Sequence, residues 1–189
     1  PGVSIMSLSI GLGVEAADTD QQIADAVIWA ADNGADVINL SLSRNSRTWP
    51  ESWDKAFLYA MQKDVLIVAA SGNRIQGDER PTAPATMPGV LAVGGITQLR
   101  EGSEMASTSG IAIDLSAPAE QMFGSFPGGE VRSWAGSSAA APIVSGLLAL
   151  MIQADPEASA NDMLQRLIGT ADDLGETGFD GIFGFGAIN

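Results

Sequence analysis

The sequence contains neither histidine nor cysteine among its 189 residues. Without cysteine the chain has no disulfide framework, no thiolate metal site and no thiol nucleophile. Without histidine it lacks the side chain that most often takes a proton from a nucleophile near neutral pH. A reaction that needs an imidazole base therefore depends on a histidine from outside this chain.

Positive charge and long apolar runs are also scarce. Nine basic residues stand against 23 acidic ones, and the net charge is −14. Such a charge repels nucleic acid and anionic membranes, so we expect neither as a partner. The apolar stretches are broken by Gly, Pro, Ser or charge before the roughly 20 residues of a membrane-spanning helix, so no membrane span is expected.

The abrupt start at Pro1, without Met or a basic targeting segment, suggests a processed or trimmed product.

What the chain does contain is an alternation of strand and helix patterns. Short apolar runs typical of strands occupy 3–10, 36–42, 65–70, 90–94 and 111–115. Helical spacing of apolar residues occupies about 19–33, 50–63, 138–154 and 158–171, and the third of these is apolar nearly all round, as a buried helix is. The alternation predicts an α/β fold with a mostly parallel sheet. No linker or repeat interrupts it, so residues 1–189 are expected to belong to a single domain.

The clearest candidate for chemistry is a serine at the start of the buried helix. Open α/β sheets bind ligands beyond the carboxyl ends of their strands. The segment Gly136–Pro142 places Ser138 where unpaired backbone N–H groups and the positive end of a helix dipole suit a nucleophile and its oxyanion. The same segment is also an ordinary helix-capping sequence.

Two further candidates follow predicted strands. Asn73 comes after 65–70, where its side-chain amide can point at a developing oxyanion; Gly72–Asn73 is equally a turn-forming pair. Ser41–Ser43 lies at the end of the predicted strand 36–42, where extended backbone can bind a peptide as an added strand; the same segment is equally explained as a plain strand end.

Taken in order, these segments resemble subtilisin-like serine proteases. The motifs that carry the resemblance are DVINLSLS, IVAASGN and GSSAAAP, and it extends to TMPGVLAVGG, IDLSAP and the closing TADDLGETGFDGIFGFGAIN. It implies a three-layer α/β/α fold that lacks its N-terminal strands here, as the C-terminal part of one catalytic domain. It also implies Ser138 as the nucleophile and Asn73 as an oxyanion-hole donor. The implied walls of the substrate cleft are Ser41, Leu42, Ser43, Ala70, Ser71 and Gly72.

The sequence departs from the family pattern at four positions. Ser43 replaces a usual glycine, a change that narrows or repolarises the cleft. Ser137 stands for the usual Thr, Ala139 for the usual Met and Ile143 for a common non-catalytic His. Each change is small or conservative enough to leave the nucleophile motif in place.

The resemblance also says where the missing residues belong. The family supplies a catalytic aspartate and histidine upstream of the strand that resembles 3–10, and the strand with the aspartate lies between 3–10 and 36–42. The absence of histidine therefore indicates that the upstream segment is missing from this chain, rather than that the histidine was mutated. We expect this chain to be inactive alone and to act as a serine endopeptidase with an N-terminal fragment that carries both residues, on a polypeptide substrate.

Other interpretations stay open. The chain can be a non-catalytic subtilase-like binding or structural domain, or a sedolisin-like protease, which uses Glu, Asp and Ser but places Asp where this chain has Asn73. No cofactor is required, and calcium is an option that the family allows through Asp172, Asp173 and Asp180, although no EF-hand spacing is present and no metal ligand is assigned. The resemblance implies an extracellular or cell-envelope setting.

Overall fold

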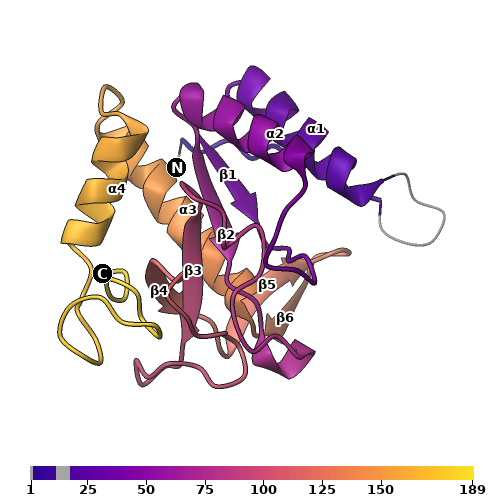
Figure 1. The fold of residues 1–189 in the computed structure, drawn as a ribbon. Coiled ribbons are helices and arrows are strands. Elements are labelled where there is room, and N and C mark those ends of the chain that lie inside the picture. Colours follow the sequence, from indigo (N-terminus) through magenta and orange to yellow (C-terminus); the bar gives the residue numbers. More distant parts are fainter. Residues whose placement is uncertain (1, 12–17) are drawn as a thin grey trace.

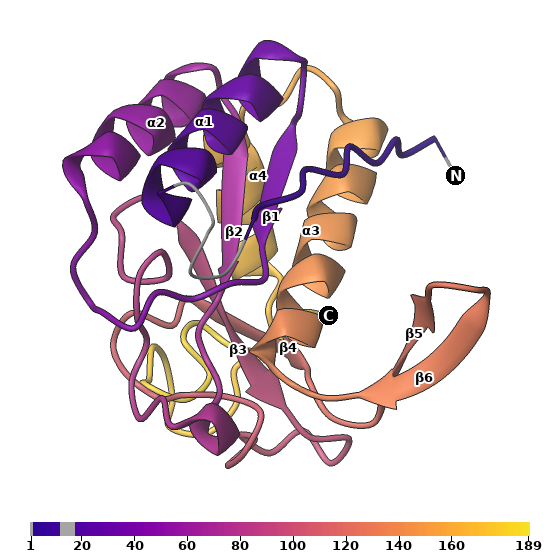
Figure 2. The same cartoon turned by 90° about the vertical axis from the view of Figure 1, so that its right-hand side faces the viewer.

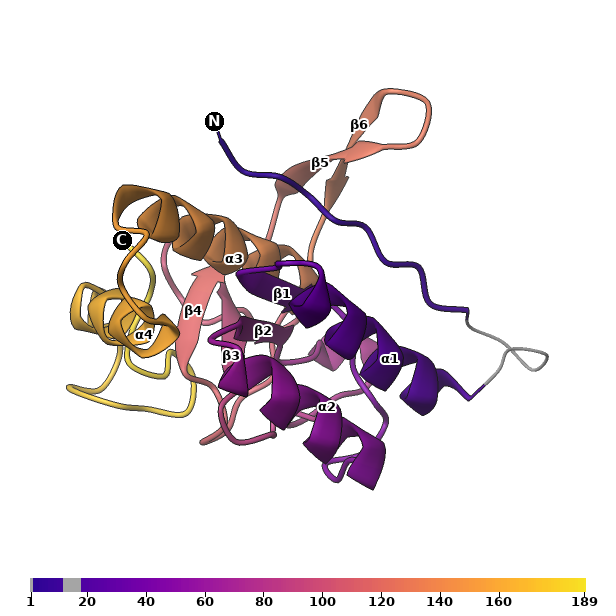
Figure 3. The ribbon, with the colours of Figure 1, turned by 90° about the horizontal axis from the view of Figure 1, so that it is seen from above.

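The computed structural model describes residues 2–11 and 18–189 as a three-layer α/β/α arrangement (Figures 1 and 3). The middle layer is a parallel sheet in the order β1-β2-β3-β4. Its strands are β1 (Val37–Leu40), β2 (Leu66–Ala70), β3 (Leu91–Ile96) and β4 (Leu115–Pro118). The helices are α1 (Thr19–Asp32), α2 (Glu51–Gln62), α3 (Ser137–Ala154) and α4 (Ala160–Gly169). The predicted fold class is confirmed.

Alternation along the buried strands creates the two halves of the core. In β2, Ile67 and Ala69 pack with α1 and α2, whereas Leu66, Val68 and Ala70 pack with α3 and α4. Successive side chains of a strand point to opposite faces, so an uninterrupted apolar run is the pattern of a strand covered on both sides. This explains why 65–70 carries no polar side chain.

The predicted strand at 3–10 is wrong. Residues 2–11 run extended past the open side of β1 (Figure 2), and within the described ranges residues 2–10 form no backbone hydrogen bond. Ile5 is 91% exposed. At its end, Gly11 donates its N–H to Gln22 Oε1 at 2.9 Å. A strand is defined by its hydrogen-bonded neighbour, and β1 stands at the edge of the described sheet with no chain paired on that side.

Strand prediction also failed around β4. Of the residues predicted as a strand at 111–115, only Leu115 lies in β4. Residues 111–112 form a turn, in which Ile111 is 86% exposed, and the N–H of Ile113 donates to Gly110 O at 3.1 Å. The sequence pattern also missed an antiparallel hairpin, β5 (Met122–Phe126) and β6 (Glu130–Trp134), which projects from the body (Figure 2). Every residue of β6 is exposed, so no burial pattern marks it.

The helix α3 is less buried than its composition predicts. It contacts all four strands of the main sheet through Ser137, Ala139, Ala140, Ala141, Val144 and Leu148. The opposite face carries Pro142, Gly146 and Leu150, all exposed. By length and composition α3 also meets the criterion for a membrane-spanning helix, which core helices of globular proteins meet as well. Its packing against the sheet is that of a core helix whose second face is open.

The contrast between Phe57 and Leu58 tests this core. Phe57 is 1% exposed and stacks on Trp53 with ring centroids 5.6 Å apart, whereas Leu58 is 56% exposed. We expect Phe57→Ala to lower the free energy of unfolding by about 3–5 kcal/mol, because it leaves a cavity in the core. Leu58→Ala on the same helix should change it by less than about 0.5 kcal/mol. Chemical denaturation measures both, and equal effects would contradict the assignment of α2's buried face.

The buried carboxyl of Asp114 predicts how the stability of the fold depends on pH. Burial raises the pKa of this carboxyl above its ordinary value of 3.8, and the N–H of Ala92, 2.8 Å from Oδ2, opposes the rise. A raised pKa means that stability is lost as the pH rises from 3.8 through the folded-state pKa. Asp114→Asn keeps an acceptor for Ala92 without the charge. Its melting temperature should exceed that of the wild type at neutral pH, and the gap should close as the pH approaches 3.8; a gap that is constant with pH would show that the charge is not the cause.

Candidate active site

Ser138 is the second residue of α3 and is half-buried. Its backbone N–H has no acceptor in the described part of the chain, as expected in the first turn of a helix. Its hydroxyl likewise has no partner among residues 2–11 and 18–189. An unpaired N–H beside an unpaired hydroxyl is the arrangement that a serine nucleophile and its oxyanion require.

The carbonyl of Ser138 is held by an unusual contact. In a regular helix this oxygen would accept from the N–H four residues later, but that residue is Pro142, which has none. Ser41 Oγ donates to Ser138 O instead, at 3.0 Å. Asn39 joins both elements, because its Nδ2 donates to Ser41 Oγ at 3.0 Å and its Oδ1 accepts from Ser145 Oγ at 3.1 Å. The end of β1 is thereby tied to the first turns of α3.

Asn73 is fixed by the residue before the candidate nucleophile. Its Oδ1 accepts the Ser137 N–H at 2.8 Å and lies 3.1 Å from Ser137 Oγ. The backbone N–H can only donate, so the carboxamide oxygen must face it and the amide nitrogen must face away. Nδ2 carries two protons, and its only acceptor among the described residues is Gln76 Oε1 at 3.3 Å. One amide proton is thus left for a ligand.

Ser137 is the buried centre of this arrangement. It is fully buried, its Oγ lies 3.0 Å from Gly72 O, and it accepts the Gly72 N–H at 3.1 Å. Gly136 makes room for it: its φ is 137°, and a Cβ there would lie 3.1 Å from Asn73 Oδ1. A side chain at this position would be strained and would press on the amide that Ser137 orients.

The six predicted cleft residues fall into two groups. Ala70, Ser71 and Gly72 are buried, and the polar backbone groups of Ser71 and Gly72 are occupied within the protein, by Val93, Thr108 and Ser137. By contrast, Ser41 and Ser43 are exposed and Leu42 is half-buried, and the three make no main-chain hydrogen bond within the described residues. Only 41–43 is therefore free to pair with an added strand, and the roles of both groups stay predictions.

A cavity that sequence reasoning missed lies beside the chain entering α3. Its volume is about 440 Å³, and Trp134 and Ala135, directly before Gly136, form part of its wall. The other lining residues are Ile75, Met105, Ala106, Glu120, Gln121 and Ser133. They come from four separate segments, so no local motif in the sequence signals them.

The acids considered for calcium are dispersed. Asp172 pairs with Arg100, Asp173 accepts the Gly178 N–H at 2.9 Å, and Asp180 accepts the Ile182 and Phe183 N–H groups at 2.7 and 2.8 Å. Among the described residues no group of three or more acidic or histidine side chains could hold a metal. Calcium remains an option without an assigned site.

Comparison with known proteins supplies the family. The model of the Subtilase family, Peptidase_S8, matches residues 1–186. The chain belongs to this family. It is 31% identical to subtilisin DY from Bacillus licheniformis over 100% of this chain and 67% of that protein. It is 36% identical to the thermophilic serine proteinase of Bacillus sp. (strain AK1), over 90% of this chain and 40% of that protein.

Solved subtilase structures share the fold. The prenylagaramide maturation protease PagA superposes with a TM-score of 0.80 at 27% identity, covering 95% of this chain and 68% of PagA. The serine protease MycP1 superposes with a TM-score of 0.78 at 30% identity, covering 90% of this chain and 56% of MycP1. The chain therefore has the fold of a subtilisin-like domain, and it spans only part of the length of these relatives.

Ser137 provides a test of the site's construction. Ser137→Ala removes the hydroxyl that faces Asn73 and Gly72, and a buried group left unsatisfied costs about 1–3 kcal/mol. With the amide less firmly oriented, we expect the rate at which a fluorophosphonate labels Ser138 to fall at least about tenfold, measured on this chain together with the N-terminal fragment that the sequence predicts. Ser137→Thr keeps the hydroxyl and should label at close to the wild-type rate. Equal labelling of all three proteins would show that Asn73 is oriented without Ser137.

Proposed function

We propose that this chain is the nucleophile-bearing part of a serine endopeptidase, active only with an N-terminal fragment that supplies an aspartate and a histidine. The observation that carries the proposal is that two donors at the start of α3 have spare capacity among the described residues. They are the Ser138 N–H and one proton of Asn73 Nδ2, and the Asn73 side chain is bonded to Ser137, the residue before Ser138. Two such donors match the needs of the oxyanion that forms when serine attacks a peptide carbonyl. Family membership supports the same chemistry.

The proposed reaction forms an acyl-enzyme on Ser138. The Oγ attacks the carbonyl carbon while its proton passes to the imidazole base, and the carbonyl oxygen gains the negative charge that the two donors stabilise. The C–N bond then breaks, the amine leaves with the proton from the base, and water hydrolyses the ester by the same steps. The sequence has no histidine, so the base must come from outside it.

The open side of the sheet supports the expected partner. The outer edge of β1 is unpaired in the described structure, and residues 2–10 run beside it without a backbone hydrogen bond. An uncovered sheet edge offers unpaired N–H and C=O groups to another chain, so a strand inserted here would add backbone hydrogen bonds to the fold. α3 lies beside β1, near residues 2–11 (Figure 3), and its exposed residues include Pro142, Gly146 and Leu150.

A polypeptide is the proposed substrate. The free main-chain groups of 41–43 can pair with an extended peptide as an added strand, which binds many sequences through the backbone. An extracellular or cell-envelope setting is part of the proposal, in keeping with MycP1, described as an essential component of the type VII (ESX-1) secretion system.

Covalent labelling tests the proposal. The native sample is analysed by intact mass spectrometry before and after a fluorophosphonate that reacts with activated serine. We expect a second, histidine-containing chain and a single adduct at Ser138, because only a serine beside a base and two oxyanion donors is activated. Ser138→Ala should abolish the adduct, and Ser145→Ala, on the next turns of α3, should not.

The alternatives predict other results. A single unlabelled chain that is monomeric and well folded would reject the two-part protease and favour a non-catalytic domain. Labelling and peptide cleavage only at strongly acidic pH would favour the Glu-Asp-Ser chemistry of a sedolisin-like enzyme.

A further inference from the structure

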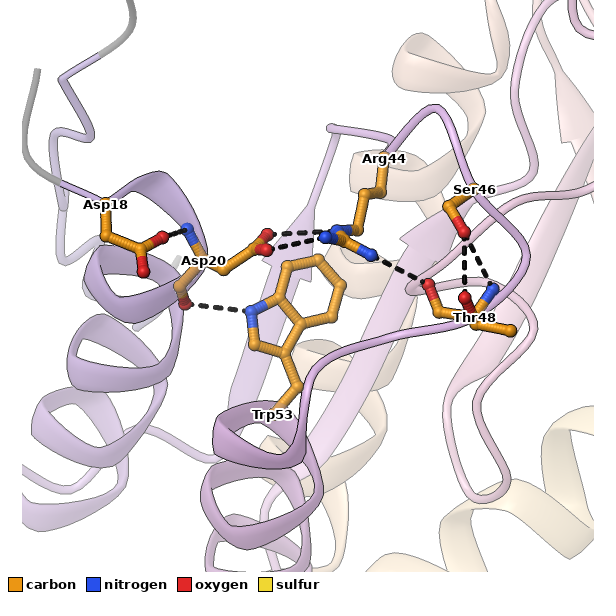
Figure 4. Close-up of polar contacts among 6 residues, drawn as sticks. All are labelled: Asp18, Asp20, Arg44, Ser46, Thr48 and Trp53. Atoms are coloured by element: carbon orange, nitrogen blue, oxygen red, sulfur yellow. Dashed lines mark hydrogen bonds and ion pairs between the residues drawn. The ribbon is translucent and has the colours of Figure 1, made fainter.

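The loop that follows β1 is held by an arginine that uses all three of its nitrogens (Figure 4). Arg44 Nε and Nη2 donate to the two carboxylate oxygens of Asp20 at 3.1 and 2.7 Å, and Nη1 donates to Thr48 O at 3.1 Å. The ion pair joins residues 24 apart in sequence, one in the first turn of α1 and one directly after Ser43. We call this contact the Asp20–Arg44 clasp.

Asp20 is itself firmly placed. Its N–H donates to the carboxylate of the cap residue Asp18 at 3.0 Å, and its carbonyl accepts from Trp53 Nε1 at 2.9 Å (Figure 4). Trp53 is fully buried at the start of α2. The first turn of a helix also favours a carboxylate electrostatically. The clasp therefore ties the loop to the layer formed by α1 and α2.

A second set of contacts holds the same loop from the other side. The Arg44 N–H donates to Ala83 O at 2.7 Å, and the Ala83 N–H donates to Ser46 O at 2.8 Å. Thr86 Oγ1 donates to Arg47 O at 2.9 Å. Residues 44–47 are thus fastened on both sides, while 41–43, just before them, keep their main-chain groups free.

We propose that the Asp20–Arg44 clasp positions the backbone of 41–43 to receive an extended peptide. The segment is held at one end by β1 and the Ser41–Ser138 contact, and at the other by Arg44. Arg44 and Asp20 are positioning residues, since neither belongs to the reacting groups. The inference rests on the proposed function, because it assigns the clasp a role in binding that function's substrate.

The clasp fixes the position of the loop more than it contributes to the free energy of folding. The side chains of Arg44 and Asp20 are 34% and 26% exposed, and ion pairs that remain in contact with water contribute little to folding. A guanidinium fork, however, fixes direction as well as distance, because it binds both carboxylate oxygens and a third acceptor at once. A lysine in this place cannot make the three contacts together.

The test compares Arg44→Ala, Arg44→Lys and Asp20→Asn in the assembled protease. The matched control is Arg166→Ala, which removes an ion pair with Asp155 at the opposite end of α3 from Ser138, with side chains 50% and 42% exposed. Each protein is assayed with an extended peptide substrate and with a single-residue ester that is too short to reach 41–43. Hydrogen–deuterium exchange of residues 41–48 is measured on the same samples.

We expect the three clasp variants to raise KM for the extended peptide about tenfold, with kcat and the KM for the ester within about twofold of the wild type. Within 41–48, exchange of the hydrogen-bonded amides of Arg44 and Thr48 should quicken about tenfold in Arg44→Ala. The control should show neither effect, and Arg44→Lys should not restore the wild-type KM.

Two results would overturn the clasp's role. The first is unchanged exchange at 41–48 in Arg44→Ala, and the second is an equal rise in KM for peptide and ester, which would indicate a general loss of structure. If the wild type neither cleaves peptide nor labels at Ser138, the proposed function fails instead, and the exchange experiment alone decides whether the pair holds the loop.

Discussion

The buried hydrogen bonds between Ser137 and the Gly72–Asn73 turn connect the two halves of the candidate site. They join the start of α3 to the loop after β2, across 64 and 65 residues of sequence, in a place closed to solvent. Away from water such bonds are costly to break, because the freed groups find no replacement partner. The position of Ser138, the direction of the Asn73 amide and the need for glycine at Gly136 all follow from this one contact.

The surroundings of Ser137 are closed to solvent, whereas the side of the molecule at the outer edge of β1 is open. The sheet is covered on both faces by helices, yet the outer edge of β1 and one face of α3 lack a covering layer among the described residues. Parallel sheets are normally buried, and an uncovered edge with a neighbouring apolar helix face is a surface suited to another polypeptide. The proposed N-terminal fragment would occupy that side and bring the base to the unpaired Ser138 hydroxyl. In this proposal the partner strand and the base arrive from the same side of the sheet.

The segment 41–43 lies between these regions and depends on both. It leaves the edge strand, touches α3 through Ser41 and ends at the Asp20–Arg44 clasp. Its supports are few and partly exposed, unlike the dry contacts around Ser137. In its proposed role as a wall of the substrate cleft, the segment keeps its backbone free for pairing, and its geometry depends on Asp20 of α1.

The sequence by itself determined the fold class, the family and the identity of Ser138 and Asn73 as candidates. Local patterns carry that information: the apolar run 65–70 is typical of a strand covered on both faces, and GSSAAAP is typical of a helix start that carries a serine. The tertiary structure decided the rest, because it depends on neighbours. Residues 3–10 have the composition of a strand but no chain to pair with, and α3 is apolar all round but covered on one side. Ser137's contacts, the cavity beside Trp134 and the Asp20–Arg44 clasp join residues far apart in sequence, so no local pattern could predict them.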